Sequence, residues 1–190
     1  MFGNAKSIEY KSLKEVCEFI DYRGKTPEKS GQGIPLITAK NVKENRFSIE
    51  PREFVPAENY ESIMTRGIPK PNDVLFTTEA PLGNVCRIPN IFDKFCVGQR
   101  IITLQPHKDI LTSEYLEQAL LAPEFQAKLL QKSSGSTVTG IRSKLLERLT
   151  IPIIPLHMQV EFVGFLQQID KSRLAGEFYE FLMPSCFKMI

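Results

Sequence analysis

The sequence predicts an α+β fold in which a β-rich first part with short helices is followed by a longer C-terminal helix. Short apolar stretches bounded by Pro, Gly or Asn-Asp recur through the first hundred residues, which is the pattern of short strands. After Pro155 the apolar side chains recur at helical spacing instead. Of the 190 residues, 42% are hydrophobic and 24% charged, so one domain with an appendage can bury a core and is too apolar to be disordered.

The first part of the chain predicts one short helix and several strands. Ser12 and Glu15 have the spacing of a capping box, which predicts a helix over residues 13–20. The stretch 21–33 contains three glycines and a proline and predicts a loop. Strands are expected at residues 34–38 and near 46–55, 73–78, 84–88 and 100–104.

The second part predicts mainly helices. Thr112 or Ser113 can cap a helix through Leu121, and Pro123 stands at a favoured first-turn position for another helix through about Leu130. After a glycine-serine loop we expect a short helix at 143–149, a buried strand at 151–154 and a longer helix beginning just after Pro155.

The longer helix has an apolar stripe that must pack on its own domain or on a partner. Val163 and Leu166 widen this stripe toward a second neighbour. The heptad pattern lasts about two repeats, which is too short to establish a coiled coil by itself. The residues expected at a dimer or partner interface are Met158, Phe162, Phe165, Ile169, Phe178 and Phe181.

Positive charge is concentrated in one segment. Residues 128–148 carry five Lys or Arg against one acid, whereas residues 1–127 and 149–190 each have a net charge of −1. The same segment is rich in glycine and small hydroxyl residues, which allow a close approach to phosphates. The alternative interpretation is a solvated loop between helices.

No motif for catalysis or metal binding is found in the sequence. Glu9-Tyr10-Lys11 matches half of a nuclease pattern, but no Asp precedes it. The four cysteines form no C-x-x-C pair, so we expect neither catalytic residues nor a metal site. The longest apolar run, Ile151 to Leu156, cannot span a membrane, and the first residues lack a signal-peptide core. We therefore expect a soluble cytoplasmic protein.

Several strings together are similar to one family. They are DYRGKTP at 21–27, GIPLITAKNV at 33–42, RGIPKPNDVLFTTEAPLGNV at 66–85, GQRII at 98–102 and GSTVTGI at 135–141. Over roughly residues 10–170 the chain resembles the target recognition domain of the specificity subunit of type I restriction-modification enzymes. The ending LTIPIIPLHMQVEFVGFLQQID resembles the junction of that family with its spacer helix. Here Met158 replaces the Glu that usually precedes Gln159 in the family.

The resemblance implies a DNA-binding target recognition domain at residues 1–154, with a twisted mixed β-sheet region, and a spacer and dimerisation helix region at 155–190. It implies a non-catalytic protein that binds double-stranded DNA. Its partners would be modification subunits, which methylate adenine with S-adenosylmethionine, and restriction subunits, which use ATP and Mg²⁺. The protein itself would need no cofactor.

Arg and Lys in the matching loops suit guanine edges or phosphates, Asn and Gln suit adenine, and hydroxyl groups can donate to phosphates. The residues expected at the DNA are Tyr22, Arg23, Lys25, Lys40, Asn41, Thr78, Glu79, Gln99, Arg100, Ser136, Thr137, Thr139, Arg142 and Lys144. Glu79 has two interpretations. It can accept a hydrogen bond from cytosine, or it can cap a turn or pair with Arg87 or Arg100.

Three questions stay open at this stage. Family members carry two recognition domains and two spacer helices, so this sequence is a half-length subunit, a truncated product or a fragment. A homodimer through residues 156–183 would read a split palindrome in DNA. A truncated decoy or assembly subunit that binds modification subunits without reading DNA is the alternative function.

Overall fold

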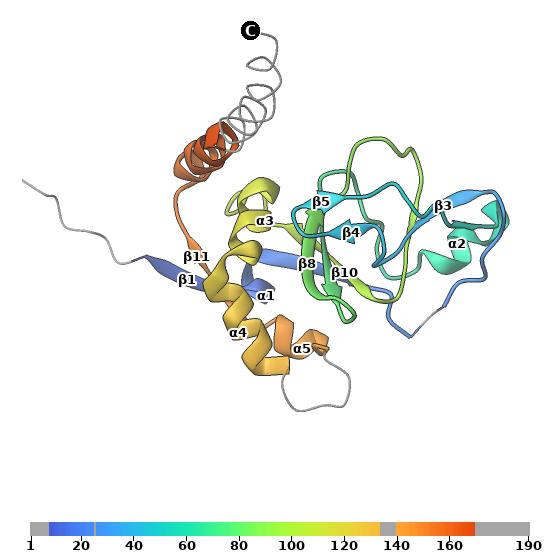
Figure 1. The fold of residues 1–190 in the computed structure, drawn as a ribbon, viewed down its shortest axis with the longest axis horizontal. Coiled ribbons are helices and arrows are strands. Elements are labelled where there is room, and N and C mark those ends of the chain that lie inside the picture. The colour runs from blue at the N-terminus through green and yellow to red at the C-terminus, as the bar shows by residue number, and fades with distance from the viewer. Residues whose placement is uncertain (1–7, 25, 134–139, 170–190) are drawn as a thin grey trace, which may run out of the picture.

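A four-stranded antiparallel sheet organises the chain (Figure 1). The computed structural model describes residues 8–24, 26–133 and 140–169. In spatial order the strands are β2 (Cys17–Asp21), β10 (Ile101–Pro106), β7 (Val74–Thr78) and β8 (Leu82–Arg87). Both central strands are buried on the two faces of the sheet, so their apolar residues do not alternate with exposed polar ones.

Helices cover one face of this sheet. They are α3 (Ser113–Leu121), α4 (Pro123–Ser133) and α5 (Ser143–Leu146). Val74 and Phe76 of β7 point into the core on this side, together with Ile102 and Leu104 of β10. Thr112 caps α3 by accepting a hydrogen bond from the backbone N–H of Tyr115.

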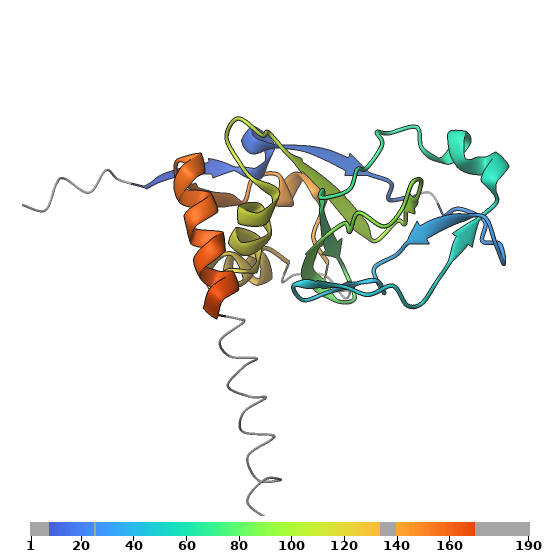
Figure 2. The same ribbon diagram turned by 90° about the horizontal axis from the view of Figure 1, so that it is seen from above.

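The other face carries a set of short strands and turns (Figure 2). A three-stranded mixed sheet has the order β6 (Phe54–Val55), β3 (Ile34–Ile37) and β9 (Cys96–Val97), with β3 and β9 parallel. Beside it lie the hairpin of β4 (Val42–Lys43) and β5 (Arg46–Phe47), the 3-10 helix η1 (Ala57–Asn59) and α2 (Tyr60–Ile63). Leu75 and Ile101 point to this side, because successive side chains of a strand alternate between faces.

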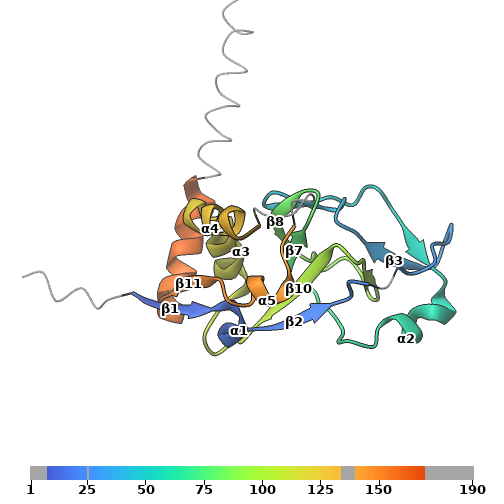
Figure 3. The same cartoon turned by 90° about the horizontal axis from the view of Figure 1, so that it is seen from below.

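The N-terminal strand and the end of the domain lie side by side (Figure 3). The pair is formed by β1 (Glu9–Ser12) and β11 (Thr150–Ile153), which are antiparallel. The helix over residues 156–169 follows β11 and lies against α3, where Phe162 contacts Tyr115. Val163 is buried in the same core as α3 and α4, so the helix docks on its own domain through this side chain.

The structure changes several predicted elements. The helix expected over 13–20 ends after α1 (Leu13–Val16), and the next five residues form β2 because they pair with β10. The strand expected near 46–55 is two short strands, and the helix expected over 143–149 ends at Leu146. Sequence analysis missed β1, β4, β9, η1 and α2.

The remaining predicted elements are confirmed. They include the capping box, in which the backbone N–H of Ser12 donates to the Glu15 carboxylate at 2.8 Å. The strands β3, β7, β8, β10 and β11 and the helices α3 and α4 lie within a few residues of their predicted bounds. Within the described ranges, none of the helices combines the length and the apolar composition needed to cross a membrane.

We predict that Gly33→Ala destabilises the protein, because Gly33 has a φ of +133° and an added Cβ would collide with the carbonyl oxygen of Val55. The expected loss is about 2 kcal/mol or more of unfolding free energy, measured by chemical denaturation. Gly31→Ala is the matched control, since a Cβ there meets nothing within 4 Å. Equal stability of the two variants would contradict this explanation.

Candidate nucleic-acid interface

Four chain segments meet at one end of the central sheet. Because β2 and β7 both run antiparallel to β10, their C-terminal ends lie beside the start of β10. The backbone N–H of Thr78 donates to the carbonyl of Arg100 at 3.1 Å, and the carbonyl of Thr78 accepts from the N–H of Ile141 at 3.0 Å. The topology thus brings together residues near 22, 79, 99 and 141 that are far apart in the sequence.

Arg23 joins two of these segments. Its guanidinium donates to the Asp21 carboxylate, at 2.6 Å between Nη2 and Oδ2, and to the carbonyl of Ile141 at 3.1 Å. Burial alone raises the pKa of Asp21, but the hydrogen bonds from Arg23 outweigh burial and hold this pKa below its ordinary value. Arg23 therefore fixes the backbone that leads into Arg142, and its donors are directed at protein acceptors.

Glu79 and Arg100 form an exposed pair at the same place. Arg100 Nε lies 3.4 Å from Glu79 Oε1, and more than half of the Arg100 side chain is exposed. Of the two bases that could pair with Glu79, Arg87 is occupied elsewhere, by Glu114 at 2.6 Å and Glu117 at 2.8 Å. Glu79 also forms a β-bridge with Gly140, so the pair lies directly beside the segment that enters α5.

The next residue, Ala80, has a left-handed backbone conformation with φ at +40°. This conformation costs a non-glycine residue roughly 1–2 kcal/mol. Strain of this kind is retained where the surrounding structure holds it, often at functional sites. Here it lies in the tight turn between β7 and β8, directly after Glu79.

A pocket of about 400 Å³ opens beside the Glu79–Arg100 pair. Its walls come from the loop before β3, the loop between β3 and β4, the β7–β8 turn and residues 98–100. The ionisable side chains that line it are Lys29, Lys40, Lys43, Arg100 and Glu53. Four cations against one carboxylate give the pocket a positive potential, which attracts phosphate.

Glu53 organises two of the lysines of this pocket. It lies 2.7 Å from Lys29 Nζ and 3.2 Å from Lys40 Nζ. The hydrogen bond from Lys29, with a smaller contribution from Lys40, holds the pKa of Glu53 below its ordinary value despite partial burial. Sequence analysis predicted Lys40, Gln99 and Arg100 in this region but missed Lys29, Lys43 and Glu53.

Three residues expected at the DNA are buried, which corrects their assignment as contacts. Tyr22 is 2% exposed, and its hydroxyl donates to the carbonyl of Gly67 at 2.5 Å. The amide of Asn41 donates to the carbonyls of Ser48 and Pro51. Thr78 is buried between Arg100 and Ile141, and all three therefore hold loops in place.

The structure describes part of the basic segment over residues 128–148. Arg142 and Lys144 are exposed at the start of α5, and Arg148 is exposed just after it. Lys25, Ser136, Thr137 and Thr139 lie outside the described residues. The exposed cations of α5 thus follow directly after the segment that bridges Glu79.

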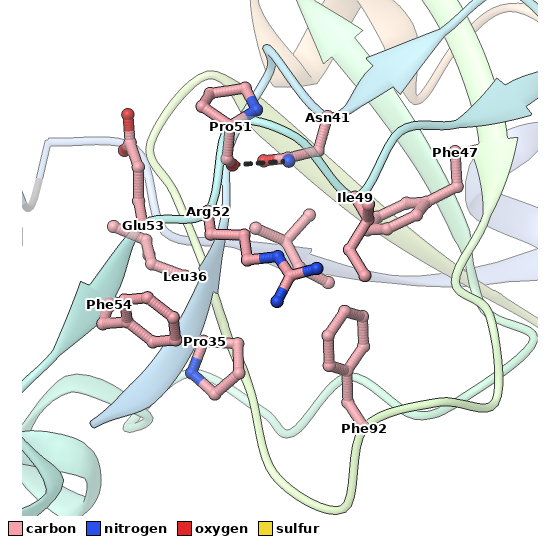
Figure 4. A pocket seen from close by; sticks show the side chains of 11 residues that line it. Pro35, Leu36, Asn41, Phe47, Ile49, Pro51, Arg52, Glu53, Phe54 and Phe92 are labelled. Atoms are coloured by element: carbon pink, nitrogen blue, oxygen red, sulfur yellow. Dashed lines mark hydrogen bonds between the residues drawn. The ribbon is translucent and has the colours of Figure 1, made fainter. Parts of the chain in front are cut away.

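A second pocket, of about 140 Å³, is mainly apolar (Figure 4). Figure 4 shows the Arg52 side chain extending across it toward Phe92, and the Asn41 amide bonded to the carbonyl of Pro51. Arg52 is the cation of this pocket and pairs with Glu50 at 3.0 Å. This pocket lacks the cluster of positive charge found beside Arg100.

The helix over residues 156–169 presents two faces. Val163 packs in the core, and Phe162 makes an edge-to-face contact with Tyr115 at 5.8 Å between ring centroids. Met158, Phe165 and Ile169 are exposed, by 61% in the case of Phe165. Phe178 and Phe181 lie outside the described residues. Docking on the same domain is thus found for one face, and the other face is exposed among the described residues, where a partner interface stays a prediction.

Metal ligation has no support in the part of the chain that the structure describes, where no group of three or more His, Cys, Asp or Glu side chains could hold an ion. Burial raises the pKa of Cys17 and Cys86 to about 12 and that of Cys96 to about 11. These thiols stay protonated and unreactive near neutral pH.

Comparison with known proteins identifies the family. The family model described as type I restriction modification DNA specificity domain matches residues 6–177. A chain from a structural study of complex assembly and conformational transition of the type I R-M system is 25% identical, with a TM-score of 0.66. The alignment covers 92% of this chain and 42% of that chain.

Two further solved structures are similar. The HsdS subunit from Thermoanaerobacter tengcongensis is 25% identical with a TM-score of 0.61, and the alignment covers 92% of this chain and 41% of that one. The S subunit of a type I restriction-modification system from M. genitalium is 17% identical with a TM-score of 0.56, covering 93% and 43%. No curated protein matches.

The chain spans about two fifths of the length of the solved structures that it matches. The α+β fold, with its antiparallel central sheet and short helices, is the fold of these specificity subunits. Because the family model covers most of the chain, the protein belongs to the family of type I restriction-modification DNA specificity domains.

Proposed function

We propose that this protein reads DNA sequence for a type I restriction-modification complex and directs adenine methyltransferase and restriction subunits to a bipartite site. The observation that carries the proposal is the exposed Arg100 in a pocket that it lines together with Lys29, Lys40 and Lys43, at the end of the sheet where β2, β7 and β10 meet. Family membership supports the same role.

In this proposal the chain has no catalytic activity and binds no cofactor of its own. S-adenosylmethionine, ATP and Mg²⁺ belong to the modification and restriction subunits, and the complex acts in the cytoplasm. The cationic pocket and the exposed cations of α5 bind the DNA backbone, while Gln99 and Arg100 reach base edges.

Arg100 is the best candidate for reading a base. Glu79 lies 3.4 Å from its Nε, and within the described residues no side-chain hydrogen bond is found for its two terminal amino groups. A guanidinium paired with a carboxylate at its Nε side can still donate its two terminal groups to O6 and N7 of guanine. A carboxylate partner also restricts the rotamers of Arg100 before DNA binds, so less side-chain entropy is lost on binding.

The uncovered face of the helix supports pairing with a second helix. Met158, Phe165 and Ile169 lie on this face, together with the exposed part of Phe162. We propose that a second copy of the chain, or the equivalent helix of a longer partner, covers it. Two recognition domains would then lie on one DNA duplex and read two half-sites.

Selection of the purified chain against randomised duplexes at moderate salt tests the function. We expect enrichment of a sequence motif, and a symmetric two-part motif if two copies pair through their helices. The control is the same selection with purified modification subunits added. Absence of enrichment under both conditions would contradict sequence reading and favour the decoy function.

Substitution of the α5 cations tests backbone contact. Arg142→Ala and Lys144→Ala are each expected to weaken binding to every duplex and to lower the salt dependence, log Kd against log salt, by about one. Lys108→Ala is the matched control, because Lys108 is exposed beyond the opposite end of β10. A salt dependence unchanged in both α5 variants would remove α5 from the interface.

Substitution of Arg100 tests base reading. Arg100→Ala is expected to relax the preference for guanine at one position of the motif, with a loss of about 1–3 kcal/mol of discrimination. Glu79→Gln should weaken the same preference by a smaller amount, because Arg100 keeps its donors but loses its anchor. Arg52→Ala, which removes an exposed arginine paired with Glu50, is the control. The assignment is wrong if the two arginine variants change the motif alike.

A further inference from the structure

A fully buried amide side chain stands at the junction between the recognition domain and the helix. Gln159 lies in the first turn of the 156–169 helix and is 0% exposed. Its Oε1 accepts the backbone N–H of Thr112 at 2.9 Å. Its Nε2 donates to the carbonyls of Ile110 and Ile154, both at 2.8 Å.

These three hydrogen bonds join three parts of the chain. Ile110 and Thr112 belong to the segment that enters α3, and Ile154 directly follows β11. A side-chain amide has two N–H donors and one carbonyl, and Gln159 uses all of them. Tilting the helix, or rotating it about its axis, would break at least one bond and leave a buried polar group without a partner.

A second anchor lies one turn further along the helix. Val163, at position i+4 from Gln159, is on the same face and is buried in the main core. Beyond it the packing is looser, because a pocket of about 200 Å³ separates α3 from the distal part of the helix at Leu166 and Gln167. The direction of the helix therefore depends on its first two turns, which hold Gln159, Val163 and the Phe162 ring that contacts Tyr115.

We propose that Gln159 is a positioning residue that fixes the direction in which the helix leaves the recognition domain. The consequence for DNA rests on the proposed function. If the helix pairs with a second helix, its direction relative to the domain sets the distance between the two half-sites. A change at Gln159 would then alter half-site spacing and leave the bases read within each half-site unchanged.

The distance between two spin labels tests the direction of the helix without DNA. Labels are attached to Glu61→Cys in α2 and Gln168→Cys near the end of the helix, both exposed positions at opposite ends of the molecule. Cys186 is replaced by serine, and the buried thiols of Cys17, Cys86 and Cys96 are unreactive near neutral pH. We expect a single narrow distance distribution for this labelled parent.

Gln159→Met keeps the side-chain length and removes all three hydrogen bonds. We expect it to widen the distribution at least twofold or to shift its mean, while far-ultraviolet circular dichroism stays that of the parent. Gln167→Met is the matched control on the same helix, exposed in this structure, and should leave the distribution narrow. A narrow distribution at the parental distance in Gln159→Met would overturn the proposal.

Gln159→Glu gives a second test within one folded protein. The ionised carboxylate has no donor for the carbonyls of Ile110 and Ile154, whereas the protonated form regains one. The distribution should therefore be wide at high pH and narrow as the pH falls, while the parent does not change. A width independent of pH in Gln159→Glu would overturn the role of the two carbonyl bonds. Because no DNA is present, these results do not depend on whether the chain reads sequence.

Discussion

The antiparallel placement of β10 between β2 and β7 is the constraint on which the interface depends. This placement brings the C-terminal ends of β2 and β7 beside the start of β10. Three loops from distant parts of the sequence therefore meet there. Alternation along β7 and β10 sends Phe76 and Ile102 into the helical core and Leu75 and Ile101 into the core of the short strands. The loops are thus held from both sides by buried apolar side chains.

The strongest local patterns predicted the fold well, and tertiary pairing accounts for the main errors. Short apolar stretches and a helix cap located β7, β10 and α3, because their signals are contained in a few adjacent residues. The segment Cys17–Asp21 could continue a helix by its own pattern, but its pairing with β10 makes it a strand. The two-residue strands β4 and β9 are too short to give any periodic signal.

The sequence predicted which loops form the candidate site, but it did not predict which side chains of those loops are exposed. The resemblance pointed to Tyr22 and Asn41 along with Lys40 and Arg100, although the first two support the loops from inside. Burial depends on the packing of the whole chain, so single loop residues do not reveal it. Lys29 was missed because acidic residues balance the basic ones in that part of the sequence. Only the fold brings Lys29 close to the other cations of the pocket.

The separation between buried loop supports and exposed cations has a consequence for evolution. Asn41 satisfies the backbone of its own loop and of residues 48–51, so the shape of that loop does not depend on the neighbouring Lys40 side chain. Exposed residues can therefore be exchanged at little cost in stability. Under the proposed function, new sequence preferences can arise by exchange of the rim side chains alone, while the buried loop supports stay the same.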